Sequence, residues 1–414
     1  MKFAHISDTH LGQRQYHLPE REQDIYDALK QAINRIIEEK VDFVIFSGDI
    51  FDRSRPPNDA VLLLMEQLML LKEKGIQLYF ILGQHDSPKS EQNAILWLYT
   101  MTEVAHYLGD EKPENFLKQG KDVLLIGFDH HDKGNDLEEL LKKFKEIDSM
   151  AKKHDGHKIL VLHQGLNDVD DFVGDLNVND LPKNFTYYAI GDIHKNFEKK
   201  YDFLGGPLVY PGSIESASTE GIKEPPKGFY IIDISSEEAI TKWIELDLRP
   251  RYVIEADSNK FHAQIEDLIS KIDPLCKPLV SLTISTEDYE KNRGIIQELD
   301  EQVLKLQIKP LESEEQYTLM MDESANIDED FKRLAIDSVG SELAQVAFEQ
   351  WYPLANEDKN EIKEIITKLE DNNTNLEESM DKYTRMTHLN EHIREQFKKQ
   401  FKKALETQFA NINN

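Results

Sequence analysis

The chain has 414 residues, enough for two or three domains, and its single cysteine, Cys276, excludes an intrachain disulfide and favours a reducing, intracellular setting. A formal charge of −29, from 78 acidic and 49 basic residues, argues against broad nucleic-acid binding through clustered positive charge. No apolar run approaches the roughly 18–20 residues of a membrane-spanning helix, so no membrane partner is expected.

The first 245 residues alternate short apolar runs with helical patterns. Because the chain opens directly on one of these runs, no signal peptide is expected. Apolar residues at helical spacing predict helices over Glu20–Glu39 and Asn58–Lys74, and a charged, exposed helix over Leu137–Lys153. This alternation predicts an α/β fold with a layered sheet covered by helices. The predicted strands are Lys2–Ser7, Val41–Ser47, Gln77–Leu82, Asp122–Phe128, Lys158–Leu162, Tyr187–Ile190 and Gly228–Ile234.

The pattern changes near Leu246–Arg251, where a small α+β domain over residues 246–322 is predicted. Its expected strands and helices alternate, and residues 323–414 are helical in pattern, highly charged and poor in strands. The predicted elements of the small domain are Tyr252–Glu255, Asn259–Ile272, Pro278–Ser285, Asn292–Gln302 and Tyr317–Met321.

The C-terminal region carries two apolar sets. Four apolar side chains spaced four apart, among lysines, predict one apolar stripe on a basic helix. The stripe can pack against its own neighbours, dock on a partner helix or groove, or lie on a membrane surface, and these alternatives remain open. The stripe is Ile393, Phe397, Phe401 and Leu405, and the second set is Phe331, Leu334, Val339, Leu343, Val346 and Trp351.

Metal-binding residue types follow five of the predicted strands. Strand ends lie together at one edge of a parallel sheet, where such folds place ligands, so these side chains should converge. Residues two apart on an extended segment point to the same side, as in Asp8-Thr-His10 and Asp192-Ile-His194. The simplest reason to bring carboxylates and imidazoles together is a pair of divalent cations. The remaining members are Asp49 and Asp52 in Gly-Asp-Ile-Phe-Asp, Gln84, His85 and Asp86 in Gly-Gln-His-Asp, and His163.

Each of these signals has a plainer interpretation when taken alone. A lone Asp-x-His is common, and a single histidine such as His163 at a buried strand end is more often a core residue. Asp52, in the turn after Asp49, fits an orienting role better than direct ligation. Asp86 can either cap a helix or orient its neighbours. The joint occurrence in order along the chain is what favours a two-metal site.

These motifs resemble the calcineurin-like metallophosphoesterases, whose pattern is D-x-H, G-D-x-x-D, G-N-H-D/E, a lone H and G-H-x-H. Within them the chain resembles the archaeal type of the Mre11/SbcD family of DNA double-strand-break repair nucleases. The stretches ISDTHLG, GDIFDRSRPPN and PLVYPGSIE carry this narrower likeness, and the motif resemblance covers about the first 235 residues. It implies a layered α/β/β/α sandwich over residues 1–245, a DNA-capping α+β domain over 246–322 and a helical region over 323–414 that binds the ATPase Rad50.

The resemblance also implies roles for individual residues. One metal would be held by Asp8, His10 and His194, with Asp49 bridging. The second would be held by Asp49, Gln84, His163 and Asp192. His85 would not be a ligand: it matches the histidine that faces the scissile phosphate and supports the leaving oxygen, and is the expected catalytic residue.

Two positions depart from the family pattern. Gln84 stands where the family has asparagine, and Asp192 where it has the first histidine of G-H-x-H. Both belong to the second metal, and the residues of the first are intact. One hypothesis is a working site with altered second-metal affinity or preference, since a carboxylate suits Mn²⁺ or Mg²⁺. The rival hypothesis is a site that loses its second ion and most activity.

The function that the resemblance implies is a nuclease with two Mn²⁺ per chain, Mg²⁺ being possible, with 3′–5′ exonuclease and single-strand endonuclease activity. It would act on DNA ends as a homodimer with Rad50, in the cytoplasm at the nucleoid, and Asn58–Lys74 is a candidate for the dimer contact. Two alternatives remain: another phosphoesterase, such as a phosphatase or cyclic-nucleotide phosphodiesterase, or a weakly catalytic scaffold that tethers Rad50 and DNA ends.

Overall fold

The computed structural model describes residues 1–88, 93–110, 112–118, 121–131, 135–169, 176–216, 222, 226–257 and 260–311. Met1–Pro310 form one compact unit. The predicted strand Tyr317–Met321, the helical region expected to bind Rad50 and both C-terminal apolar sets lie outside the described residues. Among those that are described, no helix is long and apolar enough to cross a membrane.

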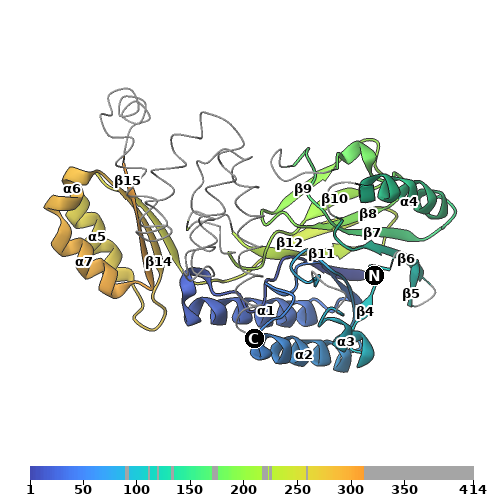
Figure 1. The fold of residues 1–414 in the computed structure, drawn as a ribbon, viewed down its shortest axis with the longest axis horizontal. Helices are drawn as coiled ribbons and strands as arrows, with labels where there is room; N and C mark the ends of the chain where they lie inside the picture. The colour runs from blue at the N-terminus through green and yellow to red at the C-terminus, as the bar shows by residue number, and fades with distance from the viewer. Residues whose placement is uncertain are drawn as a thin grey trace, which may run out of the picture. The chain divides into compact units, whose positions relative to one another are not determined.

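The first sheet has six strands in the order β12-β11-β1-β2-β3-β4. Strands β1 to β4 run parallel, β11 pairs antiparallel with β1, and β12 pairs antiparallel with β11. Three helices pack on its outer face through an apolar core that includes Leu29 and Leu64 (Figure 1). The strands are β1 (Lys2–Ile6), β2 (Phe43–Ser47), β3 (Gln77–Ile81), β4 (His106–Tyr107), β11 (Gly228–Asp233) and β12 (Ile240–Glu245), and the helices are α1 (Pro19–Glu38), α2 (Asn58–Glu73) and α3 (Trp97–Met101).

The second sheet also has six strands, in the order β5-β6-β7-β8-β10-β9. The helix α4 (Asn135–Ala151) packs on its outer face, where Phe144 contacts the ring of Phe128. Short 3-10 helices occur at η1 (Gln15–His17) and η2 (Val178–Asp180). The strands are β5 (Glu114–Lys118), β6 (Lys121–Phe128), β7 (His157–His163), β8 (Tyr187–Gly191), β9 (Phe197–Lys200) and β10 (Pro207–Tyr210).

An apolar core fills the space between the two sheets. Phe3 of β1 stacks on Phe43 of β2 at 5.0 Å between ring centroids and meets Tyr187 of β8 edge-on at 5.2 Å. Strands such as β1 and β8 are buried on both faces, which explains their nearly continuous apolar sequences. The layered α/β/β/α fold class is therefore confirmed. The expectation that all strand ends lie at the edge of one sheet was too simple, because they come from two sheets packed face to face.

A third, three-stranded parallel sheet follows, in the order β13-β14-β15. It has an apolar core of its own, built from β14 side chains such as Val280 and Leu282 and from its helices. Its third strand precedes the predicted Tyr317–Met321, and α6 was not predicted. The extent of the small domain stays a prediction. The elements are β13 (Arg251–Glu255), α5 (Phe261–Lys271), β14 (Leu279–Ile284), α6 (Thr286–Lys291), α7 (Arg293–Gln302) and β15 (Lys305–Pro310).

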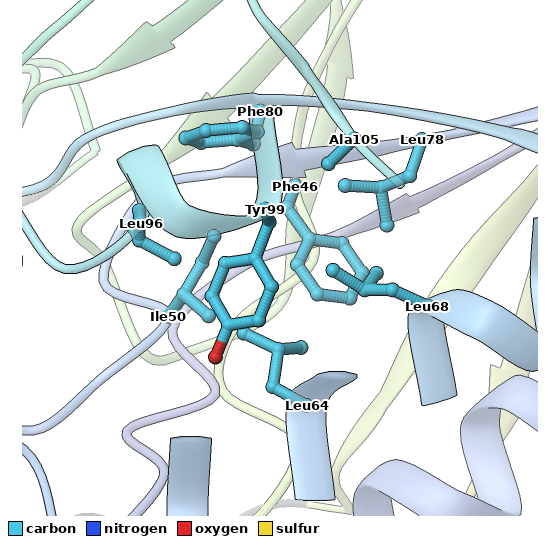
Figure 2. A pocket seen from close by; sticks show the side chains of 9 residues that line it. All are labelled: Phe46, Ile50, Leu64, Leu68, Leu78, Phe80, Leu96, Tyr99 and Ala105. Atoms are coloured by element: carbon cyan, nitrogen blue, oxygen red, sulfur yellow. The ribbon is translucent and has the colours of Figure 1, made fainter. Parts of the chain in front are cut away.

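A small apolar cavity lies where α2 and α3 pack on β2 and β3 (Figure 2). Its lining carries no charged side chain, and its one hydroxyl, on Tyr99, donates to the Val61 carbonyl oxygen at 2.9 Å. The cavity is therefore part of core packing and not a candidate for the site. It is lined by Phe46, Ile50, Leu64, Leu68, Leu78, Phe80, Leu96, Tyr99 and Ala105.

Leu68 lines this cavity, so the neighbouring side chains already leave a void. They are not expected to move in and fill the larger void that a shorter side chain at position 68 would leave. Leu68 is 2% exposed, and Leu68→Ala is expected to lower the free energy of unfolding by about 2–5 kcal/mol. Leu275, in the loop between α5 and β14 and 97% exposed, supplies the matched control, for which Leu275→Ala should change stability by less than about 0.5 kcal/mol. Urea unfolding followed by circular dichroism measures both. Equal losses would contradict the placement of Leu68 in the core.

Candidate metal centre

The site lies where β1, β2 and β3 of the first sheet and β7 and β8 of the second reach their carboxyl ends. Backbone hydrogen bonds join the first two loops: the Asp8 N–H donates to the Gly48 carbonyl at 3.1 Å and the His10 N–H to the Asp49 carbonyl at 3.1 Å. The Asp192 N–H, from the second sheet, donates to Asp8 Oδ1 at 3.2 Å. The predicted donors are thus held together by the fold itself.

Four of the predicted donors have left-handed backbone conformations. Their φ angles are +52° at Asp8, +43° at His10, +48° at Asp49 and +95° at Asp192. Such conformations cost energy in residues other than glycine, and they concentrate at functional sites. The backbone is therefore strained at the very positions that turn these side chains toward one another.

Gly48 shows how closely the two sheets approach here. Its φ is +91°, and a Cβ atom at this position would lie 2.3 Å from Nδ1 of His163. Gly83 is equally restricted, since its Cβ would lie 2.0 Å from Oδ1 of Asp49. Only glycine leaves room for His163 and Asp49 at these two places.

The first group of donors is Asp8, His10 and His194. Nε2 of His10 lies 3.0 Å from Nε2 of His194, which lies 3.9 Å from Oδ1 of Asp8. These three side chains could hold one cation. All are residues that the family resemblance assigns to the first metal.

The second group centres on Asp49 and His163. Oδ2 of Asp49 lies 3.4 Å from Nε2 of His163, and Oδ1 of Asp192 lies 3.9 Å from the same nitrogen. Nδ1 of His163 donates to the Ser47 carbonyl oxygen at 2.7 Å, which leaves Nε2 free to face the carboxylates. Asp49 Oδ2 also lies 4.0 Å from Nε2 of His10, so this carboxylate sits between the two groups, as a bridging ligand must.

Gln84 reaches the second group through its amide nitrogen. Nε2 donates to Oδ1 of Asp192 at 2.9 Å, although the two residues are 108 positions apart. The two positions that depart from the family pattern are therefore in direct contact. The family resemblance implies that Gln84 is a ligand of the second metal, and that assignment stays a proposal.

His85 lies beside both groups and is partly open to solvent, with 42% of its side chain exposed. Its Nδ1 is 2.7 Å from the Asp52 carbonyl oxygen, which makes Nδ1 the donor and directs Nε2 toward Asp49 Oδ2, 3.9 Å away. Asp52 also places its carboxylate 4.0 Å from Nδ1 of His10 and accepts a hydrogen bond from Gln13 at 2.9 Å. This arrangement supports the orienting role expected for Asp52.

Asp86 is buried and accepts three backbone hydrogen bonds. Ile50 and Phe51 donate from the loop after β2, at 3.1 and 2.9 Å, and Gly83 donates from its own loop at 3.1 Å. Burial and the nearby Asp49 raise the pKa of this carboxyl to about 7. Of the two roles considered for Asp86, these contacts support orientation, since they tie together the loops that carry Asp49 and His85.

The electrostatics of the site are dominated by burial. Burial lowers the pKa of His10 to about 3, so its imidazole is neutral and able to ligate. Burial alone would lower the pKa of His163, but Asp49, Asp8 and Asp192 together raise it well above its usual value. Burial also raises the pKa of Asp8. Positive charge is thus favoured at His163, where the carboxylates converge.

The residues present fit a pair of divalent cations. Nδ1 of His10, Oδ2 of Asp49 and Nε2 of His163 are buried without a hydrogen-bond partner among the described residues. Buried polar atoms are otherwise almost always paired, so such a cluster requires an explanation. Two of these atoms, on Asp49 and His163, point into the second group, and mixed carboxylate and imidazole donors are typical of transition-metal sites.

One supporting residue was not predicted. His5, inside β1, is fully buried, and its Nε2 lies 2.8 Å from Oγ of Ser47 while its Nδ1 lies 3.1 Å from the Tyr187 hydroxyl. Burial lowers the pKa of His5 to about 3, so it stays neutral. Its contact with Ser47 holds the residue whose backbone carbonyl oxygen orients His163. The only signal in the sequence was one polar residue inside an apolar run.

The comparisons with known proteins agree with this geometry. The family model described as calcineurin-like phosphoesterase matches residues 1–196. A DNA double-strand break repair protein Mre11 of Sulfurisphaera tokodaii is 34% identical over 309 residues, which cover 72% of this chain and 77% of that protein. The protein of the same name from Methanocaldococcus jannaschii is 36% identical over 290 residues, covering 66% and 73%. That of Thermoplasma acidophilum is 34% identical over 293 residues, covering 68% and 76%.

Proposed function

The chain belongs to the Mre11 family of calcineurin-like phosphoesterases, and we propose that it cleaves DNA ends as a two-metal nuclease in double-strand-break repair. It is a metal-dependent phosphodiesterase. The observation that carries the proposal is the pair of donor groups that share Asp49, with buried, unpartnered donor atoms beside the partly exposed His85.

In the proposed reaction Asp8, His10, His194 and Asp49 would hold one divalent cation, and Asp49, His163, Asp192 and Gln84 the other. When bound, such a pair supplies positive charge to the phosphate oxygens and activates water as the nucleophile. We propose Mn²⁺ as the physiological ion, with Mg²⁺ as the alternative, because carboxylates supply half of these ligand positions.

His85 is the side chain proposed to act directly on the leaving group. With Nδ1 held by the Asp52 carbonyl, its Nε2 is directed toward the site and is reachable from solvent. A histidine in this place can give a proton or a hydrogen bond to the oxygen that leaves phosphorus, which typically contributes 10²–10⁴-fold. We propose this as the catalytic role of His85.

For partners we propose DNA ends, the ATPase Rad50 and a second copy of the chain, in the cytoplasm at the nucleoid. The Rad50 contact would use residues 323–414, which lie outside the described residues. Support for the homodimer comes from large apolar side chains on α2 and α3: Leu62 is 61% exposed, Met69 50% and Met101 82%. Analytical ultracentrifugation tests it, since a monomer at micromolar concentration would contradict the proposal.

The activity is tested on labelled linear and hairpin DNA with Mn²⁺. The wild-type protein should cleave both, and His85→Ala should lower the rate by about 10²–10⁴-fold. His262→Ala is the matched control, since His262 lies on α5 with 67% of its side chain exposed. If neither wild type nor control cleaves, even with the ATPase partner and ATP, the scaffold becomes the better explanation.

A further inference from the structure

The two groups of donors are chemically unequal. The first combines Asp8, and the Asp49 carboxylate that both groups share, with the two imidazoles of His10 and His194. The second has a single imidazole, His163, placed 3.4 Å from Asp49 Oδ2 and 3.9 Å from Asp192 Oδ1. Imidazole suits Zn²⁺ and similar ions, whereas carboxylate and carbonyl oxygens suit Mg²⁺ and Mn²⁺. The two positions should therefore prefer different cations.

Asp192 is held firmly in the place where it makes this difference. Its backbone, at φ +95°, donates to both carboxylate oxygens of Asp8, at 3.2 and 3.3 Å. Its own side chain is 8% exposed, and its Oδ1 accepts the hydrogen bond from Gln84 at 2.9 Å. Main-chain and side-chain contacts thus fix the direction in which this carboxylate points.

Gln84 is suited to hold Asp192 without changing the charge of the site. Its amide nitrogen is the group that faces Asp192, because an amide oxygen there would meet a carboxylate oxygen and repel it. An amide is uncharged, so its hydrogen bond does not neutralise Asp192, and the carboxylate keeps its negative charge for binding a cation. Asparagine at this position would be one methylene shorter and would lose this reach.

The charge of the whole site points in the same direction. Asp8, Asp49 and Asp192 bring three negative charges against the four positive charges of two divalent cations. Without the carboxylate of Asp192 only two would remain. Strongly hydrated cations such as Mg²⁺ and Mn²⁺ need oxygen ligands and negative charge to replace their water, so they lose most when this carboxylate is removed.

We propose that Asp192, positioned by Gln84, gives the second cation position a stronger preference for Mn²⁺ and Mg²⁺ relative to Zn²⁺ than the histidine of the family pattern would give it. Gln84 acts here as a positioning residue: its amide nitrogen holds Asp192, and its amide oxygen is the group proposed above as a ligand. The proposal rests on the proposed two-metal function, which it deepens by assigning different preferences to the two positions.

The test is calorimetric titration of the full chain with Mn²⁺ and, separately, with Zn²⁺. Wild type should bind two Mn²⁺. In Asp192→His the second position should shift its preference toward Zn²⁺ by at least about 10-fold, because an oxygen ligand becomes a nitrogen ligand. Gln84→Asn should weaken the second Mn²⁺ by about 10–100-fold, as removal of a residue that orients a ligand does, while the first Mn²⁺ stays.

Two matched controls separate this effect from general damage. Asp202→His and Gln23→Asn make the same chemical changes at exposed positions and should bind both ions as wild type does. Gln84 is itself exposed, so Gln84→Asn should fold even if Asp192→His does not. Wild-type constants for both Mn²⁺ and Zn²⁺ in Gln84→Asn and in any folded Asp192→His would overturn the inference and leave the proposed function standing. A wild-type protein that binds no Mn²⁺ would instead overturn the proposed function.

Discussion

Asp49→Asn is expected to remove both bound cations and to bring DNA cleavage below detection, beyond the loss expected for His85→Ala. Asp49 Oδ2 lies 3.4 Å from Nε2 of His163 and 4.0 Å from Nε2 of His10, one donor from each group. Burial alone would raise the pKa of Asp49, but His163 and His10 lower it below its usual value, so the carboxylate is charged. An amide of the same shape therefore withdraws one negative charge from two cation positions at once.

Mn²⁺ stoichiometry by calorimetry and cleavage of labelled linear DNA measure this prediction together. Removing a residue that only orients a ligand typically costs 10–100-fold in affinity, so loss of a shared ligand should cost more. Asp27→Asn provides the control, since Asp27 lies on α1 with 59% of its side chain exposed. If Asp49→Asn still binds two Mn²⁺ with wild-type affinity, Asp49 is not the bridging ligand.

Much of this fold could be predicted from local pattern. The strands β1, β2, β3, β7 and β8 begin and end within two residues of their predicted bounds, and α1 and α2 within one. Buried strands need apolar runs and amphipathic helices need an apolar stripe, so both leave a direct trace in sequence. The donors were found for the same reason, because Asp8, Asp49 and Asp192 come directly after or within two residues of such runs.

What local pattern could not supply was the pairing of distant segments. Nothing near Gln84 indicates that its amide meets Asp192, and nothing near His5 indicates that it braces Ser47. The distribution of strands between two sheets is hidden in the same way, since β1 and β8 are both mostly apolar and buried. The strand β15 was missed because it carries only two apolar residues, Leu306 and Ile308, among lysines, a glutamine and a proline. These features are fixed only when the chain has folded.

A buried ionic cluster is another feature of this kind. Arg21 of α1, fully buried, donates to Glu215 Oε1 at 2.9 Å, and Arg251 at the start of β13 donates to the same oxygen. Arg249 donates two hydrogen bonds of 2.7 Å to the carboxylate of Asp24 on α1. The cluster thus joins α1 and the loop after β10 to the first strand of the third sheet, across up to 225 positions of sequence.

Glu215→Gln is expected to lower the unfolding free energy by about 3–5 kcal/mol. The Glu215 side chain is 1% exposed and pairs with both Arg21 and Arg251. The neutral amide of glutamine would remove the negative charge between these two guanidinium groups, and burial would keep water from replacing it. Urea unfolding measures the loss, because urea does not screen charges as guanidinium does. Glu238→Gln is the matched control: Glu238 pairs with Lys200 at 3.2 Å but is 79% exposed, and such surface pairs contribute about 0–1 kcal/mol. Similar small losses for both variants would mean that the cluster is not what holds the third sheet to α1.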